Sequence, residues 1–165
     1  MNQTEIKLRP IGIIHTPFQQ GEGTPIQPVK GKGIKGWIEI DNEYIKGLKD
    51  LDGFERIWVL FWCDRAKDVK LHVKPYMDTE IRGLFSTRAP SRPNAIGISC
   101  VKLLSVSGNR LDIEDVDMLD GTPLLDIKPY VKKFDHFQVE RCGWTDNVTN
   151  ENTKADNRFF QKGKS

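Results

Sequence analysis

A loop rich in arginine and proline, at residues 86–97, holds the side chains that best indicate chemistry in this sequence. Arg88 and Arg92 stand close together between two apolar stretches. Arginine offers a planar fork of N–H donors that matches the oxygen geometry of phosphates and carboxylates. Pro90 and Pro93 fix φ and stiffen the loop, and a preorganised loop binds a ligand at lower entropic cost. The pattern favours an anion-binding loop over a structural turn.

A second stretch, residues 119–130, combines a turn with charged residues on an apolar strand. Asp120 and the Gly-Thr-Pro that follows it are typical of a turn. Asp126 and Lys128 then share one face of the strand, because alternate residues of a strand point to the same side. Such a pair forms either a salt bridge or the wall of a site. The residues alone leave both interpretations open.

Other chemistries find little support in the sequence. The histidines are scattered and match no zinc-protease or nucleophile-triad pattern. Residues 31–36 read Gly-x-Gly-x-x-Gly, but a loop precedes them and a strand follows, whereas a dinucleotide-binding motif lies between a strand and a helix. The cysteines are odd in number and far apart, so we expect reduced thiols and neither a disulfide framework nor a metal site. They are Cys63, Cys100 and Cys142.

Length and composition are those of a single globular domain. The chain has 165 residues, of which 38% are hydrophobic and 29% charged. The net charge of +2 neither supports nor excludes an RNA partner. The N-terminus has no signal-like segment, and the longest apolar run, residues 57–63, is too short to span a bilayer. We therefore expect a soluble, cytoplasmic protein with no membrane segment.

Apolar and β-branched stretches predict seven or eight short strands and one helix. We expect the helix at residues 41–51, where apolar residues recur at helical spacing. The uninterrupted apolar run at 57–63 is typical of a strand buried on both faces. A change of apolar parity after Ile113 predicts a β-bulge near residues 114–115. The other strands are expected at residues 11–14, 34–40, 69–73, 83–87, 96–106, 124–127 and from 111 onward.

The order of these elements indicates the fold class. Strands and helices do not alternate along the chain, which disfavours a doubly wound parallel sheet. We predict a mainly β fold, a single small closed or nearly closed β-barrel with one short helix, over residues 1–142. Residues 143–165 are polar, and we expect a partly disordered tail in which Phe159 and Phe160 dock locally.

Two long strings resemble the TrmO/TsaA-like family of tRNA methyltransferases. They are Gly-Leu-Phe-Ser-Thr-Arg-Ala-Pro-Ser-Arg-Pro-Asn-Ala-Ile-Gly-Ile-Ser (83–99) and Asp-Gly-Thr-Pro-Leu-Leu-Asp-Ile-Lys-Pro-Tyr (120–130). Residues 11–17, 25–28 and 53–61 are similar to the N-terminal half of the same family. The sequence departs from the family at Ala95, where a proline is usual, and we expect no counterpart of the extra C-terminal domain of longer bacterial members.

The resemblance implies a β-barrel enzyme, usually a homodimer, that uses S-adenosylmethionine. It implies that a methyl group is placed on the exocyclic nitrogen of threonylcarbamoyl-adenosine beside the anticodon of a tRNA. It also implies a set of cofactor contacts by position in the family. These fall on Pro28, Val29, Lys30, Asp64, Arg65, Arg88, Ile98, Glu114, Asp115, Val116 and Asp117.

Such a reaction needs in-line placement of donor and acceptor, exclusion of water, and loss of a proton from a poorly nucleophilic nitrogen. Asp120 or Asp126 could accept that proton, with Lys128 holding either acid in place. Arg88 or Arg92 would hold the threonyl carboxylate or a phosphate. The expected catalytic set is Asp120, Asp126, Lys128 and Arg92, and the expected substrate-binding set is Arg88, Arg92, Asn94 and Tyr130.

Two alternatives remain open. One is a non-catalytic RNA-binding barrel, because small barrels bind single strands through basic grooves and aromatic platforms. Most of the aromatic residues available for that, such as Trp58 and Trp62, lie in apolar runs and favour the core. The other is an S-adenosylmethionine-dependent methyltransferase for a different small molecule or nucleoside.

Overall fold

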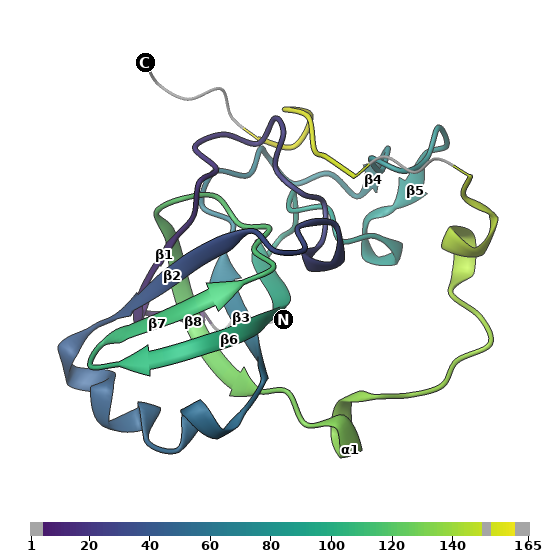
Figure 1. Ribbon diagram of the computed structural model, residues 1–165. Helices are drawn as coiled ribbons and strands as arrows, with labels where there is room; N and C mark the ends of the chain where they lie inside the picture. Colours follow the sequence, from purple (N-terminus) through teal and green to yellow (C-terminus); the bar gives the residue numbers. More distant parts are fainter. Residues whose placement is uncertain (1–4, 150–152, 161–165) are drawn as a thin grey trace.

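The computed structural model describes residues 5–149 and 153–160 of the chain. Within these residues, six antiparallel strands form a closed barrel in the order β1-β2-β7-β6-β3-β8 (Figure 1). The predicted mainly β barrel is thus confirmed. The strands are β1 (Gly12–His15), β2 (Lys35–Ile40), β3 (Arg56–Trp62), β6 (Ile96–Ser107), β7 (Arg110–Glu114) and β8 (Thr122–Pro129).

Branched aliphatic side chains fill the barrel, and they alternate with outward residues along each strand. In β3, Ile57 and Val59 are fully buried, whereas Trp58 between them is half-buried and Trp62 is exposed. The prediction that this run is buried on both faces is therefore wrong, because its second face is the barrel exterior. The buried core consists of Ile14, Ile38, Ile40, Ile57, Val59, Val101, Leu103, Leu111, Ile113, Val116, Met118 and Leu124.

Two expected strands are shorter than predicted and stand outside the barrel. Among the residues that the structure describes, β4 (His72–Val73) and β5 (Arg82–Gly83) pair only with each other. The residues after β5 form a 3-10 turn, η4 (Leu84–Ser86), and not a longer strand. The Thr87 hydroxyl donates to the Leu84 carbonyl, so this carbonyl has a side-chain partner and needs no hydrogen bond to a neighbouring strand.

The helix expected at residues 41–51 is instead a pair of 3-10 helices, η2 (Asn42–Leu48) and η3 (Leu51–Gly53). Asp50 separates them with a left-handed φ of 66°, which no continuous α-helix allows. The structure contains one four-residue α-helix in its described part, α1 (Lys132–Asp135). No helix within residues 5–149 and 153–160 has the length and apolar character needed to cross a membrane.

The β-bulge predicted near residues 114–115 is also wrong in position. β7 ends at Glu114, and Asp115 takes a left-handed φ of 69° that turns the chain across the end of the barrel. The irregularity of the β6–β7 pairing lies on β6, between Leu103 and Ser105. The change of apolar parity that suggested a bulge is therefore the end of the strand.

Three segments gather over one end of the barrel, which we call the loop end: residues 16–34, 63–95 and 153–160 (Figure 1, above the barrel). η1 (Pro28–Lys30) packs against β6 there. Phe159 is 5% exposed and forms a small second core with Val73, Leu84 and Ala89. Local docking of this part of the tail is thus confirmed, and the loop end is a packed structure of its own.

Candidate functional site

Two adjoining cavities lie at the loop end. The first, which we call the β6 cavity, has a volume of about 290 Å³. It is lined by residues 96–99 of β6, the end of β3, Asp117 and the loop that precedes β6, residues 86–95, which we call the arginine loop. The second, the Trp144 cavity, has a volume of about 570 Å³. Both fall in the size range of small-molecule sites or just below it. The two cavities share the lining residues Ile26, Gln27, Tyr76, Thr87, Arg88 and Pro90.

Asp117 supplies the only carboxylate among the residues that line the β6 cavity in the described part of the chain. The Ser99 hydroxyl donates to Asp117 Oδ1 over 2.6 Å. Desolvation raises the pKa of Asp117 to about 7, against the lowering effects of the Ser99 hydrogen bond and the nearby Arg88 guanidinium. The carboxyl can therefore take up or release a proton near neutral pH.

Gly97 lets the ring of Phe61 lie flat against β6 on the cavity wall. A Cβ built at Gly97 would stand 2.2 Å from Phe61 Cε2 and 2.4 Å from its Cζ. These distances are far below van der Waals contact, so any side chain at Gly97 would displace the ring. The residue type at position 97 thus fixes the shape of the β6 cavity.

Arg92 lines the β6 cavity but is also used to shape its own loop. Its Nη1 donates to the carbonyl oxygens of Thr87 at 3.0 Å, Ala89 at 3.3 Å and Leu84 at 3.5 Å. The guanidinium carbon lies 5.6 Å from the centroid of the Phe85 ring. The structure therefore gives Arg92 a structural task that the sequence did not indicate.

Arg88 is exposed and stands where the two cavities meet. Its Nη1 donates to Gln27 Oε1 over 2.6 Å, which links the arginine loop to the segment just before η1. Asn94 is exposed and does not line either cavity. Of the arginine-loop residues singled out from sequence, Arg88 and Arg92 are brought together in the site.

The other residues expected to contact a cofactor divide into two groups. Ile98 lines the β6 cavity, and the segments 28–30 and 64–65 directly follow the lining residues Gln27 and Cys63. Arg65 Nη2 donates to the Asp120 carbonyl at 2.8 Å and to Thr122 Oγ1 at 3.1 Å. These bonds link the segment after β3 to the start of β8 at the loop end. Of this group, Ile98 alone lines the β6 cavity, and the others are next in sequence to residues that line it.

The second group, residues 114–116, has a structural role and lines neither cavity. Asp115 Oδ2 pairs with Arg56 Nη2 at 2.7 Å, and its Oδ1 accepts the Gly33 N–H at 2.9 Å. Desolvation raises the pKa of Asp115, but these bonds outweigh it and hold the pKa below its usual value. Val116 is fully buried in the barrel core, and Glu114 lies 3.9 Å from Lys102 Nζ.

The Asp120 carboxylate is hydrogen-bonded to residues of the N-terminal segment at the loop end. Its carboxylate accepts the Thr16 N–H at 3.1 Å and the Gln19 side-chain N–H at 3.2 Å. Desolvation raises its pKa, but these bonds and nearby His15 and Arg65 lower it overall. A carboxylate with a lowered pKa is a weak proton acceptor, so Asp120 is poorly suited to the role of base.

Asp126, Lys128 and Tyr130 lie toward the opposite end of β8. Asp126 is four residues beyond Thr122, or roughly 13 Å along an extended strand. It lines a separate hollow beneath η2 and η3 and forms a salt bridge with Lys128 at 3.0 Å. The Tyr130 ring packs near Trp58, with centroids 5.9 Å apart. The structure does not bring these three residues together with the arginine loop.

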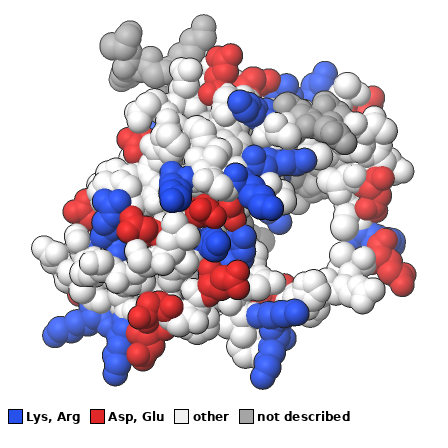
Figure 2. Space-filling model, in the orientation of Figure 1, with Lys and Arg blue, Asp and Glu red and all other residues white. Residues whose placement is uncertain are grey.

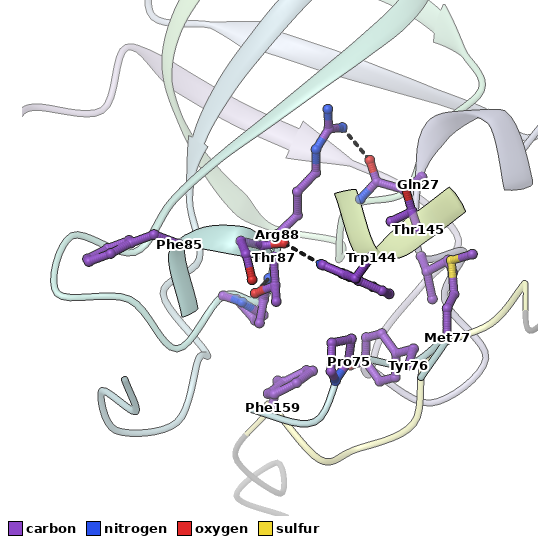
Figure 3. Close-up of a pocket in the computed structure, with 14 residues that line it drawn as sticks. Gln27, Pro75, Tyr76, Met77, Phe85, Thr87, Arg88, Trp144, Thr145 and Phe159 are labelled. Carbon is purple, nitrogen blue, oxygen red and sulfur yellow. Dashed lines mark hydrogen bonds between the residues drawn. The ribbon is translucent and has the colours of Figure 1, made fainter. Parts of the chain in front are cut away.

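The Trp144 cavity was missed by sequence reasoning. Its wall includes Tyr76, Met77, Phe85, Trp144 and Phe159, which come from three separate segments (Figure 3). The one available signal was a lone tryptophan within a polar stretch, at position 144.

Neither thiol nor metal chemistry stands out at the loop end. Burial raises the pKa of the Cys63 thiol to about 12, so it is not a reactive thiolate. Among the described residues, 5–149 and 153–160, His, Cys, Asp and Glu form no group of three or more that is placed to hold a metal ion.

Comparison with known proteins places these features in a family. The chain is 51% identical over 154 residues to a probable S-adenosyl-L-methionine-binding protein of Pyrococcus abyssi, covering 92% of this chain and 84% of that one. It is 36% identical to the mouse tRNA (adenine(37)-N6)-methyltransferase over 76% of this chain but only 31% of that protein.

Solved structures and a family description agree with these relatives. A crystal structure of TrmO from Pseudomonas aeruginosa is 33% identical, with a TM-score of 0.72, and is matched over 86% of this chain and 63% of that one. This chain therefore spans less than two thirds of the TrmO chain. Residues 13–136 match the tRNA-methyltransferase O N-terminal domain, and the chain belongs to that family.

Proposed function

We propose that this protein is an S-adenosylmethionine-dependent tRNA methyltransferase. Its acceptor would be the exocyclic nitrogen of threonylcarbamoyl-adenosine beside the anticodon. Family membership and the names of the relatives support this reaction class. The observation that carries the proposal is a carboxyl with a pKa of about 7, Asp117, set in a cavity beside Arg88 and Arg92.

The residues of the β6 cavity fit the donor. S-adenosylmethionine carries an amino group and a sulfonium, both cationic, together with a carboxylate and an adenine ring. Arg88 offers a cationic partner for the carboxylate, Ile96 and Ile98 form an apolar wall, and Asp117 gives the cavity a negative charge. The cofactor supplies a methyl group on a positively charged sulfur, a strong leaving group. Arg88, Ile98 and the adjoining segments 28–30 and 64–65 would hold it, which leaves the Asp117 carboxyl free for proton transfer.

Asp117 is the residue best placed to accept a proton. A ureido-type nitrogen must lose its proton as the methyl group arrives, and a base with a pKa near the working pH does this most effectively. Ser99 orients the carboxylate and stabilises its charged form. Arg88, at the junction of the two cavities, would hold an anionic group of the acceptor, either the threonyl carboxylate or a phosphate.

We also propose a homodimer, in the cytoplasm where tRNA is found. The connection between β8 and η5 (Gly143–Asn147) carries exposed apolar residues: Phe134 is 71% exposed and Phe137 77%. Figure 2 shows an opening between this connection and the rest of the molecule. A second copy that packs against these side chains would bury them, and light scattering of the purified protein tests this.

Mass spectrometry of tRNA nucleosides tests the main proposal. Purified protein, S-adenosylmethionine and tRNA containing threonylcarbamoyl-adenosine should yield the singly methylated nucleoside. Loss of the same nucleoside from cells that lack the gene is the matching result in vivo. Cofactor binding without tRNA methylation would favour a methyltransferase for another small molecule or nucleoside. Binding of RNA but not of the cofactor would favour a non-catalytic RNA-binding barrel.

A further inference from the structure

The Trp144 cavity is an apolar, aromatic chamber beside the proposed donor site. Its wall contains Tyr76, Phe85, Trp144 and Phe159 together with Met77, and Arg88 is the cationic side chain that lines it. Aromatic and thioether walls suit a flat, π-rich ligand, which gains stacking energy on such surfaces. A single cation at the edge suits a ligand that also carries an anionic group.

Trp144 is held in place and is not a free surface side chain. Its Nε1 donates to the Ser86 carbonyl over 2.7 Å, and the Arg82 guanidinium carbon lies 5.6 Å from its ring centroid. In Figure 3 the indole lies between the segment of Thr87 and Arg88 on one side and Pro75 and Tyr76 on the other. Preorganised stacking surfaces bind at lower entropic cost than mobile ones.

The opposite wall is equally fixed. The Tyr76 hydroxyl donates to the Asp156 carbonyl at 3.1 Å, and its ring meets Phe159 edge-on with centroids 5.1 Å apart. Desolvation raises the pKa of Tyr76, so the phenol stays neutral. Both walls therefore involve residues beyond position 136, where the match to the family domain ends.

The position of the cavity indicates what it holds. Gln27 and Arg88, joined by their hydrogen bond, belong to the lining of both cavities. Because the methyl group must pass directly from donor to acceptor, the acceptor has to lie against the donor site. The Trp144 cavity adjoins the β6 cavity and is large enough for a purine ring and its substituent.

We propose that the Trp144 cavity binds the purine base of the acceptor nucleotide, taken out of its stack, with Trp144 as a stacking and specificity-determining residue. The assignment of this cavity to the acceptor rests on the proposed function. It gives the C-terminal segment a role in substrate selection, because without Trp144 and Phe159 the chamber would lose two of its aromatic walls. Arg88 at its edge takes the anionic group of the same nucleotide.

The test compares Trp144→Ala and Trp144→Phe with Phe54→Ala, an exposed aromatic at the separate hollow beneath η2 and η3. Calorimetry measures S-adenosylmethionine affinity, and steady-state kinetics measures KM and kcat for an anticodon stem-loop RNA. We expect Trp144→Ala to raise the KM for RNA about 5- to 150-fold, which corresponds to the roughly 1–3 kcal/mol that stacking contributes per base. Cofactor affinity should stay within twofold, and Phe54→Ala should behave like the native protein. Trp144→Phe keeps an aromatic ring but loses the bond to the Ser86 carbonyl, so its KM should lie between those of the native protein and Trp144→Ala.

A second variant and a binding assay keep the result decisive. Met77→Ala removes a different part of the wall and should raise the KM for RNA in the same way, with an unchanged circular dichroism spectrum. If neither variant changes the KM for RNA, the Trp144 cavity does not hold the base.

The binding assay separates this inference from the proposed function. A short single-stranded RNA with 2-aminopurine at the target position should lose fluorescence when it stacks in the cavity, even if the protein transfers no methyl group. Quenching by the native protein that Trp144→Ala abolishes would uphold the base pocket even where tRNA methylation fails. Absence of quenching by the native protein would overturn the base pocket, whatever the outcome of the methylation assay.

Discussion

Ser99 and Asp117 meet inside the β6 cavity, with the serine hydroxyl 2.6 Å from the carboxylate oxygen that accepts its hydrogen bond. The two residues come from β6 and from the turn that crosses the barrel after β7. Desolvation raises the pKa of Asp117 to about 7, and the serine bond prevents a still larger rise. This pair is the chemical centre of the proposed site.

Asp117→Asn should lower kcat for tRNA methylation by roughly 10²- to 10⁴-fold, the usual contribution of a general base. The amide keeps the size of the side chain but cannot accept the proton. The chain offers a matched control in Asp112, which accepts a hydrogen bond from Ser105 at 2.9 Å far from the cavity. Asp112→Asn should keep the native kcat, and equal losses in both variants would remove Asp117 from the role of base.

The rate of methylation should depend on pH through the same pair. A base works only when deprotonated, so kcat should rise as pH increases through about 7, the pKa of Asp117. The Ser99 bond stabilises the charged carboxylate, so Ser99→Ala should move the midpoint of the profile upward by roughly one pH unit. A midpoint that moves downward, or a profile flat from pH 5 to 9, would contradict this.

Much of the fold follows from local patterns in the sequence, but the cavities do not. The alternating apolar residues of β6 and β7 predict two strands, because each strand needs only its own periodicity. Asp117 lies beside Ser99 because the chain turns at Asp115. The left-handed φ of Asp115 that makes this turn cannot be predicted from the sequence pattern. A parity change looks the same whether it marks a bulge or the end of a strand.

The Trp144 cavity could not be predicted from the sequence for a related reason. Trp144 contacts Ser86, 58 residues earlier, and Phe159 packs on Val73 and Leu84. Such contacts depend on how loops close over the barrel, and composition shows only that the tail is polar. The arginine loop was found because prolines and arginines are locally conspicuous, although the three carbonyl contacts of Arg92 needed the folded chain to be seen.

Gly97→Ala should weaken S-adenosylmethionine binding by about tenfold or more. The new methyl group would stand 2.2 Å from the ring of Phe61, and moving that ring changes the wall of the β6 cavity. Gly83→Ala is the control, because no heavy atom of the described residues lies within 4 Å of a Cβ built there. Calorimetric titration measures both, and unchanged affinity in Gly97→Ala would place the cofactor elsewhere.

Asp115→Asn should destabilise the protein without directly removing a cofactor contact. Asparagine tolerates the left-handed backbone of position 115 and keeps an acceptor for the Gly33 N–H, but it loses the ion pair with Arg56. Breaking such a charged hydrogen bond at a buried carboxylate, here 8% exposed, should cost about 1–3 kcal/mol of unfolding free energy at pH 7. Urea denaturation measures the loss, and S-adenosylmethionine affinity of the folded variant should stay within twofold.

The pH dependence of that loss identifies its origin. The pKa of Asp115 is lower in the folded protein than in the unfolded chain, so its charge stabilises the fold above about pH 4 and stops doing so as the pH falls through the folded value. The gap between native and Asp115→Asn unfolding free energies should therefore shrink between pH 5 and pH 2. A gap that stays constant over this range would mean that lost packing, and not the carboxylate charge, destabilises the variant. Loss of cofactor binding with no loss of stability would return Asp115 to the cofactor site that the sequence resemblance implied.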